Sequence, residues 1–391
     1  MVRAKPVSSV DANIQNIRTQ IKQKKQRLFS KLDRKTDYAS LLERHSRQID
    51  ALLKSLWDER LKATQATLVA VGGYGRGALF PFSDVDLLIL IPNAINKKEE
   101  SVIASFVSLL WDIGLDVGHS VRKLKECVNE AEKDITTQTN LMESRFLVGS
   151  KSLFTQFKNQ VVDRIDKHRF CDAKLVELRQ RHSRYNDSSQ NLEPNLKESP
   201  GGLRDLQTIL WIAQAAGFGS TWARLRENGV ITKTEQAQLE KHERALSLVR
   251  TLLHLKAGRK EDRLLFDFQR LLAADLGFRT TKAKPETEQL MQVVFKASQS
   301  VSLLSSIVLQ HLTELIHGTS NADPIIIDAD FQIRNSFLET TSPAVFNKRP
   351  HSILRFFSVL HEHSDIKGIS ARTRKELWHA KKLINDEFRN D

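Results

Sequence analysis

The stretch LVAVGGYGRGALFPFSDVDLLIL (residues 68–90) constrains the fold of this chain more than any other. An apolar run breaks at a glycine-rich turn, and a second apolar run then begins with Asp84 and Asp86. Side chains alternate along a strand, so the two carboxylates should share one side, about 7 Å apart along the backbone, while Val85 and Leu87 face the core. Ionised carboxylates beside a core are costly unless positive groups neutralise them. The stretch therefore predicts strand, turn and strand, with an acidic pair that binds something positive.

A divalent cation is the simplest group to fill that role. Mg²⁺ or Mn²⁺ takes oxygen ligands and shares its coordination sphere with substrate phosphates, and two such ions can clamp an in-line displacement at phosphorus. An isolated Asp-x-Asp is common on surface strands, but a glycine turn shortly before it resembles nucleotidyltransferases of the DNA polymerase β kind. That fold carries a third acid on a later strand. Asp116 in GLDVGHSV is our candidate for it, and Asp112, which we interpret as helix surface, is the competitor.

The glycine turn GGYGRG (residues 72–77) matches neither the Walker A nor the Rossmann pattern. Glycines at a strand end allow the backbone to approach a phosphate closely and to offer it N–H groups. We therefore assign Gly72 and Gly73 to a nucleotide site, with Arg76 adding positive charge. Ser83, next to the acidic pair, belongs to the same predicted site.

Composition limits the remaining possibilities. The 391 residues suffice for two or three domains and include only two cysteines, which excludes a disulfide scaffold and a four-cysteine zinc site. No apolar run approaches the roughly 20 residues of a membrane span, and the N-terminus lacks the apolar segment of a secretory signal. We therefore expect a cytoplasmic protein without a membrane partner. The net charge of +13 suggests polyanionic partners, but the basic residues are spread along the chain, so we do not expect a nucleic-acid patch.

Hydrophobic periodicity predicts an α+β protein: a nucleotidyltransferase domain with a small mixed sheet and helices, plus a mainly helical domain. We expect helix over 11–62, then β–turn–β–α–β, and almost continuous helix over 126–278 except for a polar loop at 186–202. A strand or hairpin is expected at 323–335 and helix again over 352–389. Four units are predicted: an N-terminal helical segment (1–62), a nucleotidyltransferase domain (63–150), a helical domain (151–318) and a C-terminal strand and helix segment (319–391).

Four separated segments resemble one family, the bacterial PII uridylyltransferase/uridylyl-removing enzymes (GlnD). They are GGYGRGALFPFSDVDLLIL, GLDVGHSVRKLKEC, NLEPNLKESPGGLRDLQTILWIA and LHLKAGRKEDRLLFDFQRLLA. The resemblance runs from about residue 60 to the end, and Ala78 is a departure where the family often has an acid. Members also carry an HD hydrolase domain and two glutamine-sensing ACT domains. None is evident here, so we expect the chain to be the transferase half.

The resemblance implies transfer of UMP from UTP to a tyrosine of the PII signalling protein, with release of pyrophosphate. Asp84 and Asp86 would hold Mg²⁺, and Asp116 would complete the metal site or act as general base. In NLKESPGGLRD we expect Lys197 and Arg204 to contact the triphosphate near a helix N-terminus or to orient the base, while Asp205 caps that helix.

Three alternatives remain open. Another protein nucleotidyltransferase, such as an adenylyltransferase, would use the same acids. A transferase acting on nucleic acid would use the positive charge, and a catalytically silent nucleotide sensor would bind without transfer. The charged run AGRKEDRLLFDFQ is interpreted as an ion-pair network at a helix end.

Overall fold

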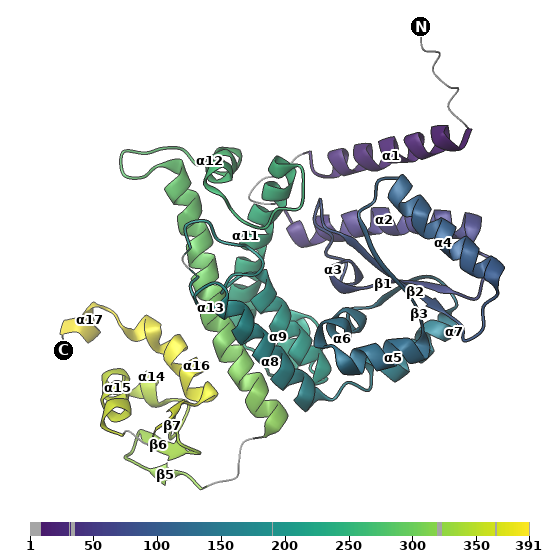
Figure 1. Cartoon of the computed structure of the whole chain (residues 1–391). Helices are drawn as coiled ribbons and strands as arrows, with labels where there is room; N and C mark the ends of the chain where they lie inside the picture. Colours follow the sequence, from purple (N-terminus) through teal and green to yellow (C-terminus); the bar gives the residue numbers. More distant parts are fainter. Residues whose placement is uncertain are drawn as a thin grey trace.

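The computed structural model describes residues 9–30, 32, 36–189, 191–318, 323–363 and 366–390. Figure 1 shows three parts in chain order. A sheet with helices on both faces comes first, a stack of helices around the long α13 follows, and a small unit of short strands and helices ends the chain.

The first sheet has four strands in the order β3-β2-β1-β4. They are β1 (Thr67–Ala70), β2 (Val85–Ile91), β3 (Val117–Lys123) and β4 (Arg145–Gly149). β1 is antiparallel to both β2 and β4, whereas β2 and β3 are parallel. The first three strands were predicted. β4 was not, because it lies within the span that we expected to be helical, and its pairing with β1 decides its conformation.

Both faces of this sheet are covered, which explains the near-continuous apolar run of β2. Val85 and Leu87 point into the core formed with α2 (Tyr38–Arg60) and α4 (Lys97–Asp112), as predicted. The other face of β2 packs against a second core. That core is built by α5 (Leu124–Lys133), α6 (Ile135–Met142), α7 (Lys151–Phe157) and the π-helical turn η1 (Lys158–Val162). Because α2 supplies core residues to the sheet and α1 (Ser9–Leu28) adds partly buried isoleucines, these helices are part of the sheet's packing.

The middle part is helical and has its own large core. Its helices are α8 (Lys167–Ser183), α9 (Leu203–Ala215), α10 (Trp222–Glu227), α11 (Lys233–Ala257), α12 (Phe266–Asp275) and α13 (Glu286–His317). By length and composition α13 could cross a membrane, although we expected no such segment. Half of the 18-residue apolar stretch of α13 is buried inside the protein, and α13 packs against α9, α11 and α12 as a core helix does.

The C-terminal part contains a second sheet in the order β5-β6-β7-β8. Its strands are β5 (Ile325–Ile326), β6 (Phe331–Arg334), β7 (Phe337–Thr340) and β8 (Gly368–Ile369). The accompanying helices are α14 (Val345–Lys348), α15 (Ser352–Glu362), α16 (Ala371–Ala380), the 3-10 turn η2 (Lys381–Leu383) and α17 (Asp386–Asn390). The hairpin predicted for 323–335 is present as β5 and β6, while β8 interrupts the helix predicted for 352–389.

Candidate active site

The three candidate acids lie at one end of two neighbouring strands. Asp86 is the second residue of β2, Asp84 directly precedes that strand, and Asp116 directly precedes β3. β2 and β3 are parallel with Val85 opposite Val117, and the Val85 N–H donates to the Asp116 carbonyl oxygen at 2.8 Å. The parallel pairing thus brings together acids that are 30 residues apart in sequence.

Asp86 is half-buried, whereas Asp116 is exposed. Burial, and next the negative charge of Asp84, raise the pKa of Asp86 to about 6, while Lys260 and Lys197 act in the opposite direction. A bound cation favours the charged form of such a group and would lower its raised pKa again. The electrostatics of Asp86 therefore suit a metal ligand.

Two glycines make room for the Asp86 carboxylate. A Cβ at Gly118 would lie 2.5 Å from Asp86 Oδ1, and one at Gly72 would lie 3.4 Å from Asp86 Oδ2. Gly72 also has a φ of +56°, and its missing Cβ would be 3.3 Å from the side-chain oxygen of Asn140. Gly118 and Asn140 were missed from the sequence. A glycine inside a strand often marks such a close approach, and this was the available signal for Gly118.

The other residues predicted from the glycine turn have different surroundings. Gly73 lies in the short helix α3 (Gly72–Gly75), and Ser83 is half-buried beside Asp84 in the chain. Arg76 forms an ion pair with Glu143, which also accepts a hydrogen bond from the Trp211 indole N–H. Arg76, which follows α3, is therefore connected through Glu143 to Trp211 on α9.

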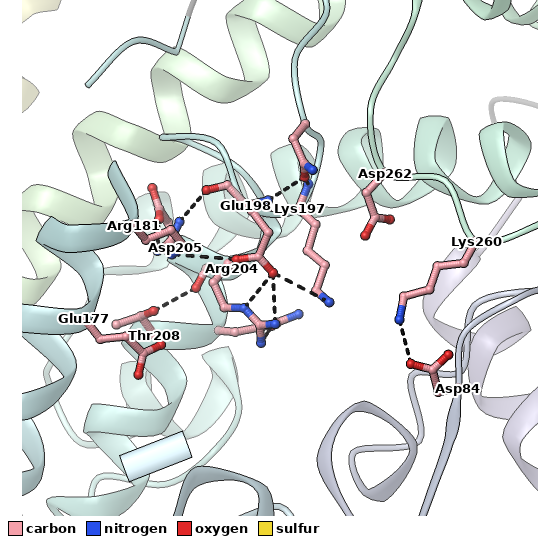
Figure 2. A network of polar contacts seen from close by, with 12 residues as sticks. Asp84, Glu177, Arg181, Lys197, Glu198, Arg204, Asp205, Thr208, Lys260 and Asp262 are labelled. Atoms are coloured by element: carbon pink, nitrogen blue, oxygen red, sulfur yellow. Dashed lines mark hydrogen bonds and ion pairs between the residues drawn. The ribbon is translucent and has the colours of Figure 1, made fainter. Parts of the chain in front are cut away.

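Two loops of the helical part face the acids. The Leu196 N–H donates to the Asp262 carbonyl oxygen at 2.8 Å, which holds the loop before α9 beside the loop after α11. This pairing places Lys197 and Lys260 on the same side of the site (Figure 2). Lys260 reaches across to Asp84, with 2.6 Å between its Nζ and Asp84 Oδ2.

In Figure 2 the side chain of Lys197 lies between the Glu198–Arg204 ion pair and Lys260. Burial, and next the positive charges of Arg204 and Arg250, lower the pKa of Lys197 to about 8. Its Nζ lies 3.6 Å from Glu198 Oε1, and Arg204 donates to the same oxygen at 3.0 Å. Lys197 and Arg204 are thus adjacent, but the guanidinium of Arg204 is already bound to Glu198.

The loop that carries Lys197 is fixed by a buried carboxylate. Asp205, only 1% exposed, accepts hydrogen bonds from the Gly201 N–H at 2.7 Å, from Arg181 at 2.6 Å and from His182 at 2.9 Å. Burial by itself would raise the pKa of Asp205, but its bonds to His182 and Arg181 hold that pKa below the usual value. Asp205 lies in the first turn of α9, but its backbone partner Gly201 comes before the N-cap residue Gly202, and among the described residues α9 has no side-chain cap hydrogen bond, so Asp205 anchors the loop where a helix cap was predicted.

The charged run after α11 contains both predicted and unpredicted contacts. Arg259 pairs with Glu261 and Arg263 pairs with Glu193, as the ion-pair interpretation expected. Lys260 differs, because its partner Asp84 lies in another part of the fold. Spacing within the run gave no indication of that contact.

A cavity of about 840 Å³ lies apart from these acids, with a lining that includes Arg47, Arg76, Arg145 and Arg244. Neither the three acids nor Lys197 and Lys260 belong to that lining. We take the acids, and not this cavity, as the candidate site. Clustered carboxylate oxygens opposite lysines suit a metal-bound triphosphate, whereas a large cavity volume by itself indicates no such chemistry.

Comparison with known proteins identifies the family of the chain. A model of the GlnD PII-uridylyltransferase matches residues 169–309, a model of the uridylyltransferase GlnD third domain matches 331–391, and a nucleotidyltransferase domain model matches 49–139. The chain belongs to the GlnD uridylyltransferase family. The nucleotidyltransferase match also confirms the predicted fold class and shows that this GlnD-family chain contains a nucleotidyltransferase domain.

Individual relatives agree with the family models. The chain is 42% identical over 376 residues to the bifunctional uridylyltransferase/uridylyl-removing enzyme of Burkholderia lata, covering 96% of the chain and 44% of that protein. The enzyme of the same name from Chromobacterium violaceum is 42% identical over 97% of the chain and 44% of its own length. The one from Bordetella avium is 45% identical over 90% of the chain and 41% of its length. The chain thus spans less than half the length of these relatives.

Proposed function

We propose that this chain transfers UMP from UTP to a tyrosine of the PII signalling protein, with release of pyrophosphate, in a reaction that depends on Mg²⁺ or Mn²⁺. The observation that carries the proposal is the gathering of Asp84, Asp86 and Asp116 at one sheet end, opposite Lys197 and Lys260. The family model and the names of the relatives support uridylyl transfer as the reaction.

The three acids fit a hard divalent cation. They offer carboxylate oxygens, which such ions prefer, and the pKa of Asp86 is raised to about 6 by burial and by Asp84 despite the nearby lysines, so that a bound cation would lower it. When bound, the ion would neutralise phosphate charge and help to lower the pKa of the attacking hydroxyl.

The chain's own residues would then orient the nucleotide and the acceptor. Lys260 exchanges Asp84 for a phosphate oxygen, and Lys197 contributes a second positive charge on the same side. The phenolic oxygen of the acceptor forms a bond to the α-phosphorus while the bond to the pyrophosphate oxygen breaks. The phenol has a pKa near 10, so its proton must be removed. Asp116, the exposed acid, would accept that proton or complete the metal site.

The test is incubation with PII, ATP, 2-oxoglutarate, Mg²⁺ and UTP labelled at the α-phosphate. We expect label on PII with the parent chain and a loss of at least about 100-fold with Asp84→Ala/Asp86→Ala, since both proposed ligands are removed. Asp112→Asn is the matched control, because Asp112 is an exposed acid at the end of α4.

Three results would refute the proposal. Label transfer that survives the double substitution would contradict the site. Transfer from labelled ATP instead of UTP would indicate an adenylyltransferase, and tight UTP binding without transfer would indicate a sensor.

A further inference from the structure

A second group of metal-ligating side chains lies on the helical part, among residues that the proposed uridylyl transfer does not use. Cys171 and Asp172 of α8 and His317, the last residue of α13, place one ligand atom each within 4.8 Å of the others. The two helices pack against each other, and Figure 1 shows α8 beside α13.

The helical repeat explains why α8 can present several ligands to one point. Residues at i, i+3 and i+4 share a helix face, so His168, Cys171 and Asp172 lie together. On α13, Thr313 and His317 are four residues apart, and the Cys171 sulfur lies 4.0 Å from the Thr313 hydroxyl. The residues of each helix thus meet those of the other at the same level.

Contacts already hold this group together. Asp172 Oδ1 is 3.0 Å from His317 Nε2, and the imidazole rings of His168 and His317 have centroids 5.2 Å apart. Cys171 is fully buried, whereas Asp172 and His317 are exposed. One side of the group therefore faces the core and the other is open to entry from solvent.

We propose that Cys171, Asp172 and His317, with His168 as fourth ligand, form a structural site for Zn²⁺ that joins α8 to the C-terminal end of α13. Sulfur and imidazole donors suit Zn²⁺, whereas Mg²⁺ prefers oxygen alone. One thiolate and one carboxylate balance the charge of the dication, so a neutral centre sits at the edge of the core.

The required movement is small. Zinc bonds of about 2.0–2.3 Å in a tetrahedron separate the ligand atoms by roughly 3.3–3.8 Å. The ligand atoms of Cys171, Asp172 and His317 lie within 4.8 Å of one another and would have to approach by about 1 Å, which side-chain torsions can supply. His168 lies outside that group, with its ring centroid 5.2 Å from that of His317, and would turn toward the ion as the fourth ligand.

Cobalt titration tests the site through its sulfur. Co²⁺ substitutes for Zn²⁺, and a cysteine ligand gives a thiolate-to-cobalt charge-transfer band in the near ultraviolet. We expect this band at one equivalent in the parent chain, its disappearance on adding Zn²⁺, and no effect of a large excess of Mg²⁺. Cys127→Ser is the matched control, because Cys127 is the other buried cysteine and packs in the sheet's core. The band should persist in Cys127→Ser and be lost in Cys171→Ser.

Variants on the exposed side keep the test decisive even if Cys171→Ser unfolds. We expect His317→Gln and Asp172→Asn to retain their circular dichroism spectra and to weaken Zn²⁺ binding by more than the roughly 10–100-fold that follows loss of an outer-shell partner. Absence of the thiolate band in the parent, or unchanged Zn²⁺ affinity in folded His317→Gln, would overturn the proposal. Because the Asp84→Ala/Asp86→Ala variant should keep the band, the outcome is independent of uridylyl transfer.

Discussion

The fit of Gly118 against the Asp86 carboxylate gives a sharp prediction about catalysis. In Gly118→Ala, the new Cβ would lie 2.5 Å from Asp86 Oδ1, whereas ordinary contacts begin near 3.4 Å. The carboxylate must therefore move by about 0.9 Å, and a misplacement of about 1 Å at a reacting centre can cost roughly 100-fold in rate. That factor corresponds to about 2.7 kcal/mol of transition-state free energy.

The assay is label transfer from UTP to PII, with kcat and KM measured separately. We expect kcat to fall by about 100-fold and the affinity for Mn²⁺, measured by electron paramagnetic resonance, to fall in parallel. The melting temperature should change little, because alanine is compatible with the strand conformation of β3.

Gly368→Ala is the control for this substitution. Gly368 also lies on a strand, β8, and its added Cβ would meet the Phe337 ring at 3.4 Å, an ordinary contact. This variant should transfer label like the parent. If Gly118→Ala kept its kcat within about threefold of the parent, the carboxylate would not need its observed position, and the reasoning would fail.

Four further predictions concern the charged groups. Mn²⁺ affinity should fall as the pH drops below about 6, because the raised pKa of Asp86 means that its carboxylate becomes protonated there; titration followed by paramagnetic resonance measures this. For UTP, kcat/KM should fall as the pH rises through about 8, where Lys197 loses its proton, and Lys197→Arg should remove the decline in a pH–rate profile. Lys260→Ala should raise the KM for UTP yet strengthen Mn²⁺ binding without nucleotide, since Asp84 loses its competing partner; equal weakening of both would contradict this. Asp205→Ala should lower the free energy of unfolding by about 3–5 kcal/mol in urea titrations, because the buried Arg181 loses its close carboxylate partner at 2.6 Å and keeps only the more distant Glu198 carboxylate at 3.9 Å.

Local pattern was sufficient for much of the sheet. β1, β2 and the helix α4 each follow from apolar periodicity within a few residues, and the side-chain alternation of β2 correctly placed Val85 and Leu87 in the core. β4 was missed for a physical reason. Only five residues long, it gains its strand conformation from pairing with β1, which lies far earlier in the chain.

The candidate site, too, could be predicted only in part from local sequence. The Asp84 and Asp86 pair and the Asp116 candidate come from short motifs, and the parallel pairing of β2 and β3 lies beyond what those motifs specify. Lys260 could not be derived from its own segment, since its contact with Asp84 spans 176 residues. The surroundings of Arg76 likewise depend on Glu143, which follows α6 and lies 67 residues later in the chain.

The two halves of the site carry opposite charges, and this division indicates how a nucleotide could organise it. The strand ends supply carboxylates, and the loops around α9 and α11 supply Lys197 and Lys260. Without a nucleotide, Lys260 and Asp84 neutralise each other at 2.6 Å. Both groups are more than a third exposed, so water screens the pair and its exchange for other partners costs little. A metal-bound triphosphate offers a cation to Asp84 and an anion to Lys260 at the same time. Under the proposed function, the ion pair therefore keeps the carboxylate and the ammonium group in place for partners that arrive together, and this role would explain why Asp84 and Lys260 are held in contact across two parts of the fold.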